Sequence, residues 1–300
     1  YQYAKEALPN ASILKLGMVN PLPRKLIESF AAKVDKLFVI EELEPIIEEQ
    51  IRSWGISVIG KELFPSIGEL SANIIAEKVL GETPEVKPLQ DIPTRPPVMC
   101  PGCPHRGVFY VIRKLRLYAT GDIGCYTLGA LPPLQAMDTC VCMGASIGMA
   151  HGMEKARGRD FGRKLVAVIG DSTFIHSGIT GLIDVVYNQG NSTVVILDNS
   201  TTGMTGHQDH PGTGCTLKGS EVPPLDLVKL IEAIGIKHIR VVDPFELDQV
   251  EKVLREEVQR DEPSVVIMQR SCALLNKSVK PPVEIDLDLC RKCNACLRLG

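Results

Sequence analysis

The stretch Lys164-Leu-Val-Ala-Val-Ile-Gly170-Asp171-Ser172 is an apolar run that ends in a Gly-Asp pair. Residues 173–197 separate it from a second ending of this kind, where Thr193-Val-Val-Ile-Leu197 leads into Asp198-Asn199. Both runs have the length and the β-branched content of buried strands. Between them, one predicted helix face is formed by Ile179, Leu182, Ile183 and Val186. The region therefore predicts a strand, a crossover helix and a second, parallel strand.

This unit brings two polar side chains to one edge of the predicted sheet. Asp171 and Asn199 both follow carboxyl ends of strands, where open α/β sheets bind ligands. Neighbouring strands are about 5 Å apart, so the two side chains can share one ion. A carboxylate, an amide oxygen and the backbone carbonyl of Thr201 are hard ligands, which Mg²⁺ accepts together with phosphate and water. The pattern predicts a Mg²⁺ and diphosphate site, with a simple turn before a helix as the alternative.

Composition and charge limit the class of protein. The 300 residues are 44% hydrophobic and 23% charged, which is typical of a globular chain with room for two domains. A net charge of −3 gives no electrostatic reason to expect nucleic acid or an anionic membrane as a partner. The sequence has neither a bilayer-spanning apolar stretch nor a signal peptide at its start. We therefore expect a cytoplasmic protein without a membrane partner.

The first part of the chain, residues 1–82, alternates short apolar segments with amphipathic ones and predicts a small α/β domain. Its predicted strands are 13–17, 36–41 and 56–60, and its predicted helices are 23–34, 45–54 and 66–80. Residues 83–97 are rich in proline and are expected to be a linker.

Residues 98–280 continue the strand and helix alternation. Besides the unit around Asp171, they contain predicted helices at 107–115, 225–234 and 246–259 and predicted strands from 117, at 236–242 and at 264–269. The predicted fold class is α/β, with two domains built on mainly parallel sheets.

Ten cysteines are many for a chain expected in a reducing compartment, where disulfide frameworks are rare. Cys100 and Cys103 precede a predicted helix, and Cys125 and Cys272 each follow a predicted strand. If these strands join one sheet, all four thiols share the edge that carries Asp171. Four cysteines can bind zinc or a 4Fe-4S cluster, and simple buried thiols are a third reading; the spacing leaves these open. The remaining thiols of this region are expected in the core or a pocket: Cys140, Cys142 and Cys215.

Cys290, Cys293 and Cys296 have the two-residue gaps that open the bacterial ferredoxin motif. That motif needs a fourth cysteine after a three-residue gap, where Gly300 stands. We therefore expect the missing ligand of this 4Fe-4S site beyond the end of the chain. On this reading the chain is a fragment, and 281–300 are the truncated start of a ferredoxin domain.

Five short motifs, taken together, indicate a relationship to a known family. They are Cys100-Pro-Gly-Cys-Pro-His-Arg106, Gly121-Asp-Ile-Gly-Cys-Tyr126, Met143-Gly-Ala-Ser-Ile-Gly148, Gly170-Asp-Ser-Thr-Phe-Ile-His-Ser-Gly178 and Asp198-Asn-Ser-Thr-Thr-Gly-Met-Thr-Gly-His-Gln208. Together they resemble the α subunit of indolepyruvate ferredoxin oxidoreductases. Residues 1–82 resemble that family's transketolase C-terminal-like domain, and 98–280 resemble its thiamine diphosphate-binding domain. Ser172 and Asp198 depart from the commonest spelling, which has glycine and asparagine there, but neither removes a metal ligand.

The resemblance implies the cofactors and their residues. Thiamine diphosphate and Mg²⁺ would be bound by Gly144, Gly170, Asp171, Ser172, Asn199 and Thr201, with Asp171, Asn199 and the Thr201 carbonyl as the metal ligands. A proximal 4Fe-4S cluster would be bound by Cys100, Cys103, Cys125 and Cys272. The small residues at Gly144 and Gly148 are equally well explained by close helix packing.

The resemblance also implies a reaction. An aryl 2-oxoacid such as indolepyruvate, coenzyme A and oxidised ferredoxin would give an aryl acyl-CoA, CO₂ and reduced ferredoxin, with the family's β subunit as a partner. The pyrimidine-binding domain with the activating glutamate is expected before Tyr1, so the fragment alone is expected to be inactive.

Two other classes of function remain open. One is another thiamine enzyme: a different 2-oxoacid ferredoxin oxidoreductase, or a non-oxidative decarboxylase or synthase with structural zinc. The other is a non-enzymatic electron-transfer module. His176, His207 and His210 flank the predicted metal site and are candidates to orient substrate, without an assigned catalytic role.

Overall fold

The computed structural model describes residues 1–82, 92–275, 284–294 and 296. It divides into two compact units, Tyr1–Thr94 and Arg95–Gly300. In the described part, no helix combines the length and the apolar character needed to cross a bilayer.

The second unit is built on a six-stranded sheet in which every described pair of neighbours is parallel. The strand order is β2-β1-β3-β4-β6-β5. The strands are β1 (Tyr118–Gly121), β2 (Thr139–Cys140), β3 (Leu165–Gly170), β4 (Thr193–Asp198), β5 (His238–Val242) and β6 (Ser264–Gln269). All-parallel strands explain why β3 and β4 are apolar almost throughout, because both faces of such a sheet are covered.

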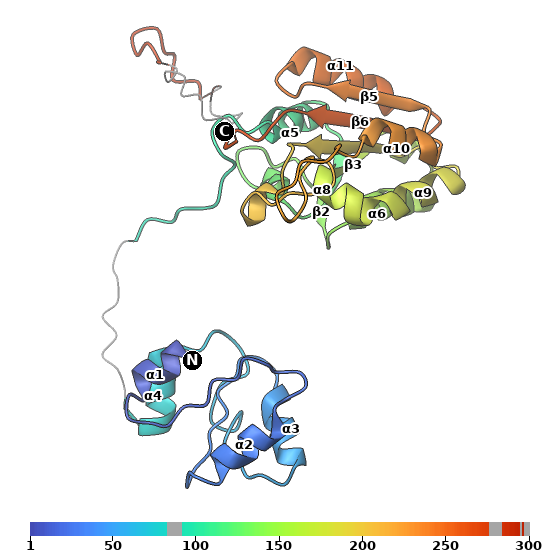
Figure 1. The fold of residues 1–300 in the computed structure, drawn as a ribbon. Helices are drawn as coiled ribbons and strands as arrows, with labels where there is room; N and C mark the ends of the chain where they lie inside the picture. The colour runs from blue at the N-terminus through green and yellow to red at the C-terminus, as the bar shows by residue number, and fades with distance from the viewer. Residues whose placement is uncertain (83–91, 276–283, 295, 297–300) are drawn as a thin grey trace. The chain divides into compact units, whose positions relative to one another are not determined.

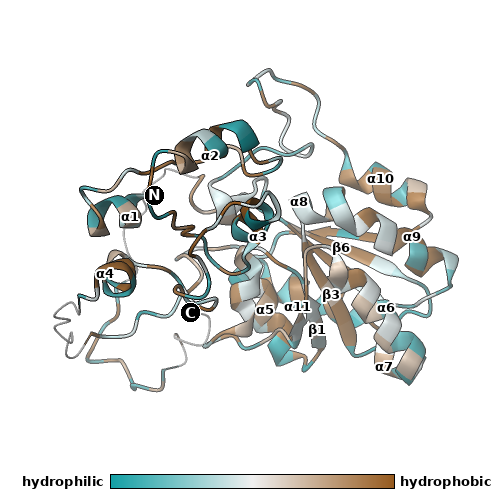
Figure 2. Cartoon of the chain, turned by 90° about the horizontal axis from the view of Figure 1, so that it is seen from below, coloured by the Kyte–Doolittle hydropathy of each residue, from teal (hydrophilic) through white to brown (hydrophobic). Residues whose placement is uncertain are grey.

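Helices cover both faces of this sheet (Figure 1). One face packs against α5 (His105–Lys114) and α11 (Leu247–Glu257), and the other against α6 (Ala145–Arg157), α9 (Ile179–Tyr187) and α10 (Leu227–Ile234). Alternate residues of β3 enter the two cores: Val166 and Val168 join the first, Ala167 and Ile169 the second. Figure 2 shows the hydrophobic colour along β3 and β6 between the two helix layers. Short elements complete the unit: α7 (Arg159–Gly162), α8 (Asp171–Thr173), the π-helical turn η2 (Phe174–Gly178) and the 3₁₀ turns η1 (Cys125–Ala130) and η3 (Gly203–Thr205).

The predicted strand–helix–strand unit is confirmed, because β3 and β4 pair in parallel with Gly170 opposite Leu197. One detail of its helix was wrong. Ile183, which was predicted to face the core, is 49% exposed, and Val185 is fully buried instead. The helix begins as α8 and passes through the wider η2 turn, so α9 does not continue an undistorted helical register from Asp171.

The described residues of the first unit form four helices: α1 (Gln2–Ala7), α2 (Arg24–Ala31), α3 (Ile46–Ser53) and α4 (Ala72–Leu80). The last begins later than predicted, where the Ser71 hydroxyl accepts a hydrogen bond from Ile74 N at 3.3 Å and caps the helix. The α1 helix was not predicted. Its short length and the absence of a side-chain cap at Tyr1 give little sequence signal.

The predicted sheet of the first unit was wrong. Among the described residues, segments 13–17, 36–41 and 56–60 form no strand, and the structure has only a parallel bridge between Phe38 and Ile59. The alternation of side chains is nevertheless present: Leu37 and Val39 enter one small core, and Phe38 and Ile40 enter another. Alternation defines an extended backbone, but a sheet also needs a neighbouring strand in register along several residues.

Candidate functional site

Asp171 lies directly after β3 and is 3% exposed. Its Oδ1 accepts a hydrogen bond from Ser172 N at 2.8 Å, and its Oδ2 accepts one from Ser200 N at 3.0 Å. These two amides hold the carboxylate between the ends of β3 and β4. Because each oxygen keeps a second lone pair, the carboxylate can still bind a cation.

A second carboxylate, Asp198, stands next to Asp171 at the end of β4. Burial raises the pKa of Asp198, and the charge of Asp171 raises it further, while the amide of Gln269 opposes the shift from 2.8 Å. Among the residues that the structure describes, neither carboxylate forms an ion pair with a lysine or an arginine. Two adjacent acids without a cationic neighbour fit a site for a divalent metal.

Asn199 and Thr201 are both buried, at 7% and 5% exposure. The Asn199 side chain is held at both ends: Nδ2 lies 3.4 Å from His105 Nε2, and Oδ1 accepts from Thr201 N at 3.3 Å. The Asn199 backbone carbonyl accepts from Cys272 N at 2.9 Å. The structure therefore brings Asp171, Asn199 and Thr201 to one edge, and this set of oxygen donors fits Mg²⁺.

His105 was not predicted to be part of the metal site. It is the first residue of α5 and is 3% exposed, and its ring meets the ring of Tyr126 edge to face at 5.9 Å between centroids. Burial lowers the pKa of His105 to about 4, against a smaller opposing effect of the Asp171 charge. The imidazole is thus neutral at physiological pH. Its sequence signal was present in the Cys100–Arg106 motif, which had been interpreted only through its cysteines.

The three predicted histidines occupy different positions. His210 is buried and its Nε2 lies 3.3 Å from Asp171 Oδ2 without a hydrogen bond aligned to it. His207 is half-buried, with Nε2 3.9 Å from Cys272 Sγ. His176 is exposed and contacts its neighbour Ser177. Only His210 reaches the carboxylate at the centre of the site.

Gly170 and Ser172 shape the loop around Asp171. A Cβ on Gly170 would come within 2.7 Å of the Tyr126 ring, so this position requires glycine. The Ser172 hydroxyl accepts a hydrogen bond from Thr202 Oγ1 at 3.1 Å and joins the loops after β3 and β4. Serine at the position where glycine is commoner therefore has a structural use here.

Gly144, which was predicted to bind cofactor, directly precedes α6 and is hydrogen-bonded to the carboxylate of Asp122. Its N–H donates to Asp122 Oδ2 at 2.8 Å, and Asp122 is fully buried after β1. Gly144 has φ 87°, and a Cβ there would meet Ser177 Cβ at 2.4 Å. Close packing thus accounts for this glycine, while its role toward a cofactor stays a prediction. Asp122 lies inside a quoted motif, yet its role as a helix cap was missed.

Four predicted thiols share one neighbourhood. Burial raises the pKa of Cys103 to about 11, and the charges of Cys100, Cys125 and Cys272 add to this shift. The pKa of Cys125 is raised by burial and by Cys272 and Cys100. However, across the described ranges no three His, Cys, Asp or Glu side chains are placed closely enough to hold one metal ion. The thiols are gathered, but they are not arranged as a ready-made ligand set.

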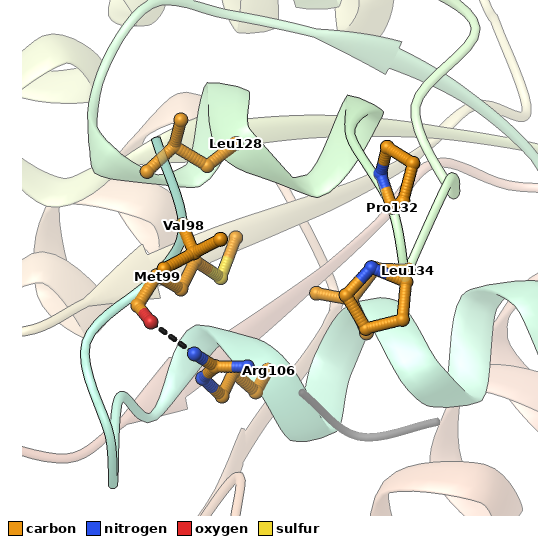
Figure 3. Close-up of a pocket in the computed structure, with 7 residues that line it drawn as sticks. Val98, Met99, Arg106, Leu128, Pro132 and Leu134 are labelled. Atoms are coloured by element: carbon orange, nitrogen blue, oxygen red, sulfur yellow. Dashed lines mark hydrogen bonds between the residues drawn. The ribbon is translucent and has the colours of Figure 1, made fainter. Parts of the chain in front are cut away.

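The loop that carries Cys100 is pinned by Arg106, which donates from Nε to the Cys100 carbonyl at 2.9 Å and also bonds the Met99 carbonyl (Figure 3). A small cavity of about 120 Å³ lies beside it, lined by Val98, Met99, Arg106, Leu128, Pro132, Pro133 and Leu134. Its size and apolar lining exclude a cofactor of the size of thiamine diphosphate.

The remaining thiols lie elsewhere. Cys140 and Cys142 are exposed, so their predicted place in a core or pocket was wrong. The structure puts Cys140 on the edge strand β2 and Cys142 in the loop after it. Cys215 is half-buried. Cys290, Cys293 and Cys296 are exposed, and residues 276–283, where the predicted ferredoxin domain begins, lie outside the described residues.

Comparison with known proteins agrees with this geometry. Residues 122–268 match the family model of the thiamine pyrophosphate enzyme C-terminal TPP binding domain. The chain is also similar in fold to a 2-oxoglutarate:ferredoxin oxidoreductase from Magnetococcus marinus, with a TM-score of 0.51 at 18% identity over 63% of this chain and 67% of that one. The sheet edge with Asp171 and Asn199 thus lies within the residues that match a thiamine pyrophosphate-binding domain.

A more particular relationship follows from sequence. The chain is 38% identical to the indolepyruvate oxidoreductase subunit IorA of Pyrococcus abyssi over 99% of its own length and 52% of that protein. It is 39% identical to the subunit of the same name from Archaeoglobus fulgidus, over 98% and 52%. The chain is therefore a homologue of indolepyruvate oxidoreductase subunit IorA, and it spans about half the length of these relatives.

Proposed function

We propose that the chain is part of a thiamine diphosphate-dependent 2-oxoacid:ferredoxin oxidoreductase that acts on aryl 2-oxoacids of the indolepyruvate kind. The observation that carries this proposal is the uncompensated pair Asp171–Asp198 beside the buried amide of Asn199, in a homologue of IorA. Such a pair favours the binding of a cation, and a hard cation in turn binds a diphosphate. The fold similarity and the matched domain support the same class.

In the proposed reaction, one 2-oxoacid, one coenzyme A and two oxidised ferredoxins give acyl-CoA, CO₂, one proton and two reduced ferredoxins. When bound, thiamine diphosphate supplies the electron sink for decarboxylation. Asp171, Asn199 and the Thr201 carbonyl would hold Mg²⁺ and so fix the diphosphate. The neutral rings of His105 and Tyr126 and the buried Asp122 cap keep this edge of the sheet rigid and partly closed to water.

The partners and further domains belong to the same proposal. A β subunit, ferredoxin and coenzyme A would be the partners, in the cytoplasm. Residues 1–82 would be the transketolase C-terminal-like domain, 98–280 the diphosphate-binding domain and 281–300 the start of a ferredoxin domain. Cys100, Cys103, Cys125 and Cys272 would bind a 4Fe-4S cluster, which requires movement of the thiols from their described positions.

The test uses the protein with every segment and subunit with which it is isolated, under anaerobic conditions. Indolepyruvate, coenzyme A and oxidised ferredoxin should yield CO₂ and reduced ferredoxin in a ratio of one to two. Colourless, zinc-containing protein that releases CO₂ without reducing ferredoxin would replace this proposal with a non-oxidative thiamine enzyme. Protein that binds no thiamine diphosphate would exclude both.

A further inference from the structure

His105 connects the cysteine loop to the metal-binding amide. Its backbone N–H is directed to the Cys103 sulfur, and its ring lies 3.4 Å from Asn199 Nδ2. The ring and the amide are both buried, at 3% and 7% exposure. The nitrogen of an imidazole ring that bears no proton can accept a hydrogen bond from an amide NH₂ group, and Nε2 is the ring atom that faces Asn199 Nδ2.

The direction of this contact decides what Asn199 offers to a cation. A carboxamide has one oxygen that can bind a metal and one NH₂ group that cannot. If Nδ2 donates to His105, then Oδ1 faces the other way, toward Thr201 N and the site. If the amide were turned over, the NH₂ group would face the cation.

We propose that His105 is a positioning residue that holds the Asn199 amide with its oxygen toward Mg²⁺. This inference rests on the proposed function. His105 contacts neither the metal nor the diphosphate in it; it acts only through Asn199. Groups of this kind behind metal ligands are typically worth about 10–100-fold in metal affinity.

The experiment measures the affinity for thiamine diphosphate by titration calorimetry in saturating Mg²⁺, on the isolated protein with all its segments and subunits. His105→Leu removes the acceptor and fills much of the space, and it should lower the affinity about 10–100-fold. His105→Gln returns an acceptor oxygen to nearly the same place and should restore most of that loss. Equal affinity in His105→Leu and wild type would overturn the proposal.

A second set of variants, made in Asn199→Asp, distinguishes the positioning role of His105 from a purely structural role. In Asn199→Asp both side-chain oxygens can bind the metal, so there is no amide left to orient. His105→Leu should therefore cost much less affinity in this background than in wild type. The same cost in both backgrounds, or an equal loss in His105→Gln and His105→Leu, would show that His105 only fills space.

The controls distinguish this inference from the function on which it rests. If wild type does not bind thiamine diphosphate with Mg²⁺, the proposed function fails. If wild type binds it and Asp171→Asn does not, the proposed function stands, and the two His105 variants alone decide the inference. Thermal unfolding of each variant without cofactor confirms that the compared proteins are folded.

Discussion

Two buried carboxylates stand at opposite ends of the sheet. Asp171 follows the carboxyl end of β3, whereas Glu154 lies beside Asn191 and Ser192, just before the amino end of β4. They are 3% and 2% exposed, so burial does not distinguish them. Each also accepts two hydrogen bonds from nearby loop residues.

Their charged neighbours differ. Lys155 Nζ lies 3.9 Å from Glu154 Oε1, and His151 Nδ1 lies 3.5 Å from Glu154 Oε2. Asp171 likewise has a histidine beside it, with His210 Nε2 3.3 Å from Oδ2, but its charged neighbour is another acid, Asp198. A buried acid beside a lysine has a cation to balance its charge, whereas one beside another acid has none of its own and favours binding a cation. We therefore interpret Glu154 as structural and Asp171 as ligand-binding.

The largest expected effect comes from changing Asp171 to its amide. Asp171→Asn keeps the shape of the side chain but removes the charge that Mg²⁺ requires. Affinity for thiamine diphosphate in Mg²⁺ should fall about 100-fold or more, roughly 2.8 kcal/mol. Without cofactor the variant should be at least as stable as wild type, because the repulsion with Asp198 is gone. Calorimetry and urea unfolding measure the two quantities.

A matched control for this variant is Asp160→Asn, whose side chain is 95% exposed. It should change neither the affinity nor the free energy of unfolding by a measurable amount. An Asp171→Asn protein with wild-type affinity would contradict the metal site.

The same chemical change at Glu154 should have the opposite pattern. Glu154→Gln weakens charge-assisted hydrogen bonds from Asn191 N at 3.0 Å and Ser192 Oγ at 2.9 Å, so unfolding should become easier by about 2 kcal/mol. The affinity for Mg²⁺ and thiamine diphosphate should stay at the wild-type value. Urea unfolding of Glu154→Gln and of the half-exposed control Glu256→Gln measures the difference. A loss of affinity without a loss of stability would reverse our interpretation of the two acids.

His210 tests the Asp171 side of the comparison more finely. Its Nδ1 accepts a hydrogen bond from Gly212 N at 3.2 Å, so Nε2 is the nitrogen that carries a proton, beside Asp171. That buried N–H has no aligned acceptor among the described residues. The oxygens of a bound diphosphate would offer one, and His210→Ala should lower the affinity for thiamine diphosphate about tenfold, roughly 1.4 kcal/mol.

The exposed His176 provides the control, because His176→Ala lies in the neighbouring loop and should leave binding unchanged. Titration calorimetry on both variants decides the point. If His210→Ala binds thiamine diphosphate as tightly as wild type does, the buried N–H of His210 makes no contact with the cofactor.

The sequence predicted the regular parts of this architecture better than the contacts at its site. β6 begins and ends at the predicted residues, and β3 and β4 differ by one residue, since long apolar runs and turn residues are local signals. The sheet of residues 1–82 could not be predicted correctly, because strand pairing depends on non-local register. Asp171 and Asn199, in contrast, were found from the ends of apolar runs, which are local signals. The contact between His105 and Asn199 joins residues 94 positions apart and has no local signature.

The smallest expected effect concerns an exposed acid with a complete partner, Asp243. Its Oδ1 accepts from Arg270 Nε at 2.7 Å, and this contact lowers the pKa of Asp243, which is the opposite of the shift at Asp198. The folded-state pKa lies below that of the unfolded chain, about 3.9, so the stabilisation is present above this pH. It is lost as the pH falls through the folded-state pKa.

Asp243→Asn should therefore make unfolding easier by about 0.5 kcal/mol at pH 7. The expected value is small because water screens this ion pair: the Asp243 side chain is 35% exposed and that of Arg270 is 40% exposed. At a pH well below the folded-state pKa the carboxyl of wild type is protonated, so the two proteins should unfold alike there. Urea unfolding at both pH values measures the change. An equal cost at the two values would mean that Asp243 acts through its shape and its bond to Phe245 N, which an amide oxygen can also accept. In that case the charge beside a carboxylate would no longer distinguish the structural acids of this sheet from Asp171.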